Sequence, residues 1–91
     1  MSQRTVGRSK LRLRAMHAAV ASLTLRESQV FALVVRGKLN KQIAHELGTS
    51  ERTVKAHRHA VMQKLGVRSV AEAVSIAGAL DMLAPPGHGA E

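Results

Sequence analysis

The chain has 91 residues, with 14 Lys and Arg against 6 Asp and Glu, no Cys and one aromatic residue, Phe31, and its formal net charge is +8. This length allows one small hydrophobic core and excludes a catalytic cleft between two domains. The absence of Cys excludes disulfides and thiolate metal cages, the scarcity of aromatic side chains disfavours single-strand binding by base stacking, and the charge favours a polyanionic partner.

The N-terminal 22 residues carry five basic side chains and no acidic one. We expect residues 1–8 to form a tail and residues 9–22 a linker or docking helix, with a thin apolar stripe of Leu13, Met16 and Val20. The segment lacks the apolar core of a secretory signal, and no run reaches the roughly 18 apolar residues of a membrane span. Its composition also fits a mitochondrial transit peptide, but we interpret the chain as cytoplasmic.

The core domain is predicted to begin at Leu23. Thr24 and Glu27 have the spacing of a capping box, in which each side chain bonds the other residue's backbone amide. A helix should follow to about Arg36 and end at Gly37, with Val30, Phe31 and Val34 on its apolar face.

Two further helices are predicted on either side of a tight turn. Asn40 is suited to cap a two-turn helix that ends at Gly48, and Ser50 is suited to cap a longer helix over residues 51–65. Two helices joined by three residues that include Gly are typical of a helix-turn-helix, whose second helix enters the DNA major groove.

The helix over residues 51–65 is predicted to be amphipathic. At 100° per residue, Val54, Val61 and Leu65 point towards the core. The polar and basic side chains of the opposite face can donate hydrogen bonds to base edges, and the small Ala56 allows the helix to approach a thymine methyl. This face comprises Arg52, Lys55, Ala56, His59 and Gln63. His57 and Arg58 flank the core side, so we expect them to reach a phosphate or an internal acid such as Glu27.

A last helix is predicted from a second capping box, Ser69 and Glu72, to about Leu83, with residues 84–91 disordered. One face should pack on the core through Val70, Ala73, Val74, Ala77 and Leu80. A second uncharged face is a candidate contact for a weak homodimer, although small residues there can equally serve to avoid aggregation; it comprises Ala71, Ser75, Gly78 and Met82.

Several short motifs resemble the LuxR-type (GerE-like) helix-turn-helix domain, and most closely the output domains of FixJ- and NarL-kind response regulators. They are Leu23-Thr24-Leu25-Arg26-Glu27, Gly37, Asn40-Lys41-Gln42-Ile43-Ala44, Leu47-Gly48, Ser50, Thr53-Val54-Lys55-Ala56-His57 and Met62-Gln63-Lys64-Leu65-Gly66-Val67. The resemblance covers residues 23–83 and implies an all-α, four-helix domain of a bacterial transcription regulator, here preceded by the N-terminal linker helix.

The resemblance also implies how the residues divide on duplex DNA. The family's base readers match Lys55, Ala56 and His59, with Arg52 and Arg58 as additions. Its phosphate contacts match Asn40, Lys41, Ser50, Thr53, His57 and Lys64, to which we add Arg58 from its position on the helix. A receiver domain and RNA polymerase are the partners that such a regulator implies. The basic linker favours a fragment of a longer regulator over a free-standing output domain.

Three other functions remain as alternatives: a sigma-like promoter-binding helix-turn-helix, a helical anti-activator that grips another regulator, and a membrane-surface segment. We predict no enzyme activity, because no nucleophile lies beside an obvious base and orienting acid. The five His residues lack the spacing of a metal site, so we expect no metal or other cofactor.

Overall fold

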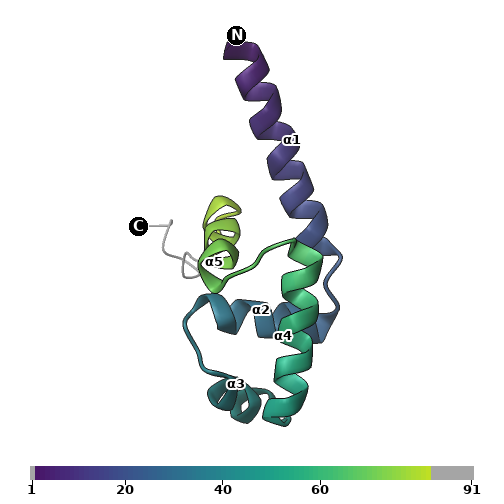
Figure 1. Cartoon of the computed structure of the whole chain (residues 1–91), viewed down its shortest axis with the longest axis vertical. Helices are drawn as coiled ribbons and strands as arrows, with labels where there is room; N and C mark the ends of the chain where they lie inside the picture. The colour runs from purple at the N-terminus through teal and green to yellow at the C-terminus, as the bar shows by residue number, and fades with distance from the viewer. Residues whose placement is uncertain (1, 83–91) are drawn as a thin grey trace, which may run out of the picture.

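The computed structural model describes the backbone of residues 2–82 and the side chains of residues 10–82. Over this part of the chain the fold is all-α, as predicted, and has no strand. Figure 1 shows its five helices, which are α1 (Ser2–Ala21), α2 (Leu25–Val35), α3 (Asn40–Leu47), α4 (Glu51–Leu65) and α5 (Val70–Ala79).

A first core cluster holds the helix-turn-helix together. It buries Val30, Leu33 and Val34 of α2, Ile43 and Ala44 of α3, and Val54 of α4. Because all three helices contribute, the packing in this cluster fixes the angle between α3 and α4.

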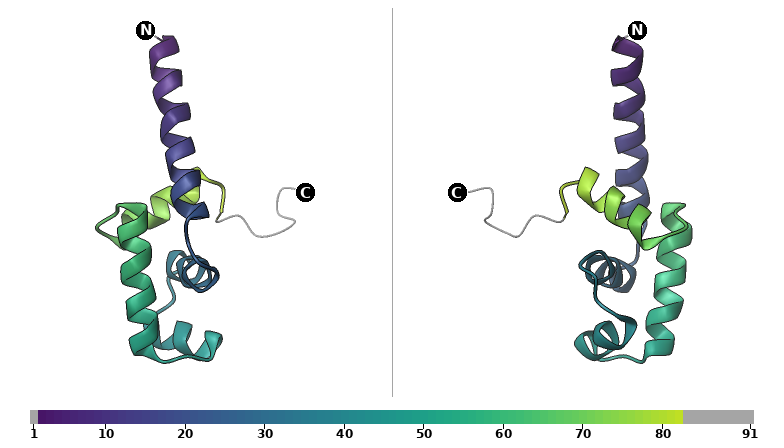
Figure 2. Two further views of the ribbon diagram at one scale, coloured as in Figure 1. Left: turned by 90° about the vertical axis from the view of Figure 1, so that its right-hand side faces the viewer. Right: turned by 60° about the vertical axis from the view of Figure 1, so that its left-hand side comes forward.

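A second core cluster joins the other end of α4 to α5 and α1. Its buried members are Phe31, Val61, Leu65, Ala73, Ile76 and Ala77. Met16, Ala19 and Val20 of α1 pack against this cluster. The last turns of α1 therefore pack against the core, and the rest of the helix projects from the body of the molecule (Figure 2). The longest extent of the molecule is 50 Å.

Two predicted helix starts differ from the structure. The tail expected over residues 1–8 is wrong, because α1 already begins at Ser2. Its sequence contains no Pro that would stop a helix from extending, and extension costs little once a helix is nucleated. Asn40 is also not the N-cap of α3, since Leu39 occupies that position and its backbone N–H donates to Gln42 Oε1 over 2.8 Å.

The predicted end of the last helix at Leu83 is wrong, because α5 ends at Ala79. Asp81 has a left-handed backbone (φ 58°), and the Met82 N–H donates to Ala77 O over 2.8 Å, a pattern that terminates a helix. Met82 therefore lies beyond α5. Residues 83–91, which include the predicted tail, lie outside the described residues.

The start and the core face of α5 agree only in part with the prediction. Ser69 Oγ accepts from the Glu72 N–H over 3.2 Å, which is one half of the predicted capping box. Ala73 and Ala77 are buried as expected, but Ile76 is buried as well, while Val74 and Leu80 are only half-buried.

In the part of the chain that the structure describes, no single helix has the length and apolar character needed to cross a membrane. The segments Lys10–Ala21 and Leu25–Val35 pass that test only when taken together, and they are bent by 118° relative to each other.

Candidate nucleic-acid interface

The turn between α3 and α4 is closed by local hydrogen bonds. Gly48 ends α3 with a left-handed backbone (φ 66°), and the Thr49 N–H donates to Ala44 O over 2.9 Å. Ser50 then caps α4, because its Oγ accepts from the Thr53 N–H over 3.1 Å. The three-residue turn predicted at residues 48–50 is thus confirmed, and it places the N-terminus of α4 beside α3 (Figure 1).

The outward face of α4 is a continuous exposed surface. Val54, Val61 and Leu65 are buried against the core, as the helical periodicity predicted. The residues of the opposite face are all exposed; they are Arg52, Lys55, Ala56, His59 and Gln63. Since α4 spans 15 residues, or about 22 Å at 1.5 Å per residue, this face can follow a major groove over several base pairs.

One edge of this face is formed with the N-terminus of α3. Arg58 is half-buried, and one of its guanidinium nitrogens donates to Asn40 Oδ1 over 3.0 Å. Lys41 lies next to Asn40 in the first turn of α3 and is exposed. The structure therefore brings together three of the predicted phosphate-binding residues, in a region where the free backbone N–H groups of a helix start favour an anion.

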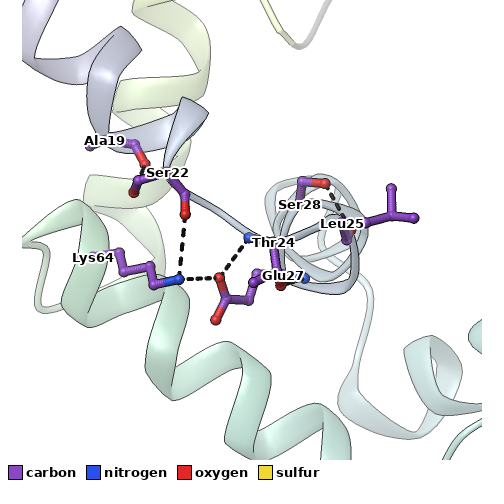
Figure 3. A network of polar contacts seen from close by, with 7 residues as sticks. All are labelled: Ala19, Ser22, Thr24, Leu25, Glu27, Ser28 and Lys64. Carbon is purple, nitrogen blue, oxygen red and sulfur yellow. Dashed lines mark hydrogen bonds and ion pairs between the residues drawn. The ribbon is translucent and has the colours of Figure 1, made fainter.

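The other edge contains an ion pair that the sequence did not predict. Lys64 Nζ lies 2.6 Å from Glu27 Oε1 and 3.4 Å from the backbone oxygen of Ser22, as Figure 3 shows. Of the two partners expected for His57 and Arg58, Glu27 is not the one found, because Lys64 pairs with Glu27 and Arg58 bonds to Asn40. The other partner, a phosphate, stays a prediction. A phosphate contact by Lys64 would have to compete with this ion pair.

Glu27 is 6% exposed and also completes the capping box predicted at the start of α2. Its Oε1 accepts from the Thr24 N–H over 2.8 Å, and its own N–H donates to Thr24 Oγ1 over 3.1 Å. The hydrogen bond from Lys64 and that from the Thr24 amide lower the pKa of Glu27 below its ordinary value of 4.5. One carboxylate thus starts α2 and ties it to α4.

The two edges lie on opposite sides of α4. In Figure 1, α3 and α5 lie to the left of α4, whereas the connection between α1 and α2 lies to its right. Thr53 is exposed and His57 half-buried, and their helical positions place them towards the Lys64 side. The predicted phosphate-binding residues therefore occupy both sides of the exposed face.

The candidate dimer surface on α5 is only partly a helix face. Ala71, Ser75 and Gly78 are exposed on α5, while Met82 follows the helix and is 38% exposed. Ser75 also lines a hollow of about 330 Å³ between α1 and α5. One side of the predicted surface is therefore bordered by α1.

Sequence reasoning missed Arg68 as a candidate site residue. It lies in the connection between α4 and α5, and it lines a hollow beside α4 together with Lys55 and Arg58. Its single positive charge in an otherwise acidic C-terminal third was the available signal. Within the described residues, no group of three or more His, Asp or Glu side chains is arranged to hold a metal ion.

Residues 21–77 match a family described as bacterial regulatory proteins of the luxR family. Over 61 residues the chain is 49% identical to the response regulator protein TmoT of Ectopseudomonas mendocina. The matched region covers 67% of this chain and 28% of TmoT. It is 52% identical over 52 residues to the spore germination protein GerE of Bacillus subtilis. This match covers 57% of this chain and 70% of GerE.

The fold is also similar to a solved structure of full-length FixJ from B. japonicum. The TM-score is 0.77 at 37% sequence identity, and the match covers 87% of this chain and 39% of FixJ. The chain thus spans about a quarter of the length of TmoT and well under half of FixJ.

Proposed function

Since this chain belongs to the luxR family of bacterial regulatory proteins, which are DNA-binding transcription regulators, we propose that it reads duplex DNA with α4 in the major groove. The observation that carries this proposal is the exposed basic face of α4, held directly behind a three-residue turn from α3. An α-helix with its side chains is about 10–12 Å wide and fits a groove of about 12 Å.

Membership in this family also confirms that the chain is not an enzyme, because its relatives are regulatory proteins. The helix-turn-helix geometry itself would serve a sigma-like promoter-binding domain equally well. The family match and the similarity to response regulators favour the luxR assignment.

The base-reading residues in this proposal are Arg52, Lys55, Ala56 and His59. Lys and Arg donate to the O6 and N7 acceptors of guanine, and His donates through a ring nitrogen. Ala56 lies between these longer side chains and lets the helix approach the base edges. These four residues determine which sequence is bound.

The phosphate-binding residues set the register of α4 on the DNA and carry no sequence information directly. On the α3 side they are Asn40, Lys41 and Arg58, and on the other side Thr53 and His57 accompany Ser50 at the start of α4. Lys64 joins them only if a phosphate draws its amino group from Glu27.

We further propose that the chain acts as the output module of a response regulator. Its linker helix α1 would connect it to a receiver domain, and RNA polymerase would be its partner at the promoter. A cytoplasmic location and weak dimerisation through α5 on adjacent half-sites complete the proposal. The similarity to TmoT, which is named a response regulator protein, supports it.

Selection from random double-stranded DNA at about 150 mM salt tests this function. Non-specific phosphate binding weakens steeply at this salt concentration, whereas base readout persists. We expect enrichment of paired half-sites about one helical turn apart. A chain that enriches no duplex but captures a regulator protein would act as an interaction module instead.

Single substitutions separate base readers from phosphate binders. Lys55→Ala and His59→Ala should each change the preferred base at one position by roughly 1–3 kcal/mol of discrimination. Lys41→Ala should weaken binding to all duplexes alike and reduce the salt dependence. Both are measured by titrating a panel of single-base operator variants. Identical behaviour of the two groups would refute the division.

A further inference from the structure

A shallow hollow of about 430 Å³ lies beside α4, next to the connection between α4 and α5. Met62 and Val67 are half-buried and provide apolar contact surface within it. Its basic side chains are Lys55, Arg58, His59 and Arg68. Among the residues that line it, all of which the structure describes, none is acidic, so the hollow is suited to an anion.

Arg58 links this hollow to the N-terminus of α3. It lines the hollow and donates one hydrogen bond to Asn40, the first residue of α3. A guanidinium has five N–H donors in a planar fork, so one bond to Asn40 orients the group without using its capacity for an oxyanion. Arg68 approaches the same hollow from the α4–α5 connection.

The position of the hollow around α4 favours a phosphate over a base edge. Met62 and Arg58 lie about a quarter turn or more away from Arg52 and Ala56 at the centre of the exposed face, and Lys55, His59 and Gln63 border the hollow on its base-reading side. A helix about 10–12 Å wide nearly fills a groove of about 12 Å, so its flanks meet the sugar-phosphate backbone on either side. The hollow and α3 lie on the same flank and therefore face the same DNA strand.

We propose that this hollow is a second phosphate-binding site, in which Arg68 and Arg58 hold one phosphate of the strand that also contacts the start of α3. Two anchors on one strand, one at the start of α3 beside the middle of α4 and one at the α4–α5 connection, fix the angle of the helix in the groove. The inference rests on the proposed function, because it requires α4 to lie in a major groove.

Salt titration of duplex binding by Arg68→Ala tests the proposal. The duplex enriched by selection and a scrambled duplex are used, each with wild type and variant. Loss of one charged hydrogen-bonding group should weaken binding about tenfold on both duplexes. The slope of log affinity against log salt should fall by about one. Arg68→Lys should keep the slope but recover only part of the affinity, because it lacks the fork.

Arg26→Ala is the matched control, since Arg26 is exposed on α2, bonds to Gln29 and does not line the hollow. It removes the same charge and should leave the slope unchanged. Equal effects of Arg26→Ala and Arg68→Ala would overturn the second site while leaving duplex binding intact. A loss confined to the enriched duplex would show Arg68 to be a base reader and would also overturn it.

A scan with neutral methylphosphonates locates the phosphate. One substituted position should weaken wild type about tenfold and affect Arg68→Ala less, because one of the two arginine partners of that phosphate is already absent. Equal losses in both proteins at every position would contradict the proposal. A wild-type chain that binds no duplex at all would instead refute the proposed function itself.

Discussion

Lys64 illustrates how a single residue can take a role that its sequence motif does not reveal. The motif assigned it to phosphate, whereas the structure pairs it with Glu27, 37 positions earlier in the chain. Glu27 is nearly buried and also caps α2, so its charge is satisfied by two donors from different elements. This ion pair joins the start of α2 to the last turns of α4.

The ion pair predicts a specific dependence of stability on pH. The folded pKa of Glu27 lies below its unfolded value of 4.5, so its stabilising contribution is complete above pH 4.5 and is lost as the pH falls through the folded pKa. Lys64→Met removes the main cause of the lowered pKa. Thermal unfolding from pH 7 to pH 3 should therefore show a lower Tm at pH 7 and a smaller further decrease in acid than wild type.

Lys38→Met is the control for that measurement, because Lys38 is exposed in the α2–α3 connection. It changes the net charge equally and should retain the acid dependence of wild type. Parallel Tm curves for Lys64→Met and Lys38→Met would show that the pair with Glu27 contributes nothing to stability.

At the scale of elements, the turn between α3 and α4 depends on one backbone conformation. Gly48 has a φ of 66°, which is unfavourable for residues with a Cβ, and no neighbouring atom lies within 4 Å of where a Cβ would be placed. A substitution there therefore tests backbone conformation alone, without a steric clash.

Gly48→Ala should destabilise the domain by about 1 kcal/mol, because the Cβ of Ala lies too close to the following carbonyl oxygen in the left-handed conformation, whereas Gly has no Cβ. For a domain of this size we expect a Tm roughly 4–8 °C lower. Gly48→Asn should lose less, since Asn tolerates this conformation best among residues with a side chain. Calorimetry checks both variants, and an Ala variant as stable as wild type would contradict the expected backbone strain.

At the scale of the whole molecule, α5 and α1 share the end of the domain away from the helix-turn-helix. α5 packs Ala73, Ile76 and Ala77 on the second core cluster and leaves its opposite side exposed. Since Ser75 lines the hollow against α1, a change at Ser75 would disturb both α1 packing and any dimer contact. Gly78 is a cleaner position for testing dimerisation.

Gly78→Arg should weaken cooperative binding to paired half-sites and leave binding to a single half-site unchanged. A long charged side chain on this surface would keep two α5 helices apart, while the fold tolerates it because Gly78 is exposed. Gel-shift titration on duplexes with one and two half-sites measures the difference. Ala18→Arg, on the exposed side of α1, adds the same charge as a control; cooperativity retained in Gly78→Arg would argue against an α5 dimer.

The sequence by itself determined the features that depend on residues three or four positions apart. The Thr24–Glu27 capping box, the Ser50 cap, the turn at Gly48 and the buried stripe of α4 follow from local hydrogen bonds and helical periodicity. The exposed face of α4 could be predicted for the same reason, because burying Val54, Val61 and Leu65 leaves the opposite residues in solvent.

Only the tertiary structure decided which side chains meet across elements. Arg58 with Asn40, Lys64 with Glu27, and Arg68 beside α4 join residues brought together by packing around the two core clusters. The predicted end of α5 was wrong because the helix is terminated by Asp81 in a left-handed backbone conformation. Residues with a side chain rarely adopt this conformation, and no sequence motif indicates it at Asp81. Local rules thus define the elements, whereas the charges around the exposed face of α4 are arranged by the packing of distant segments.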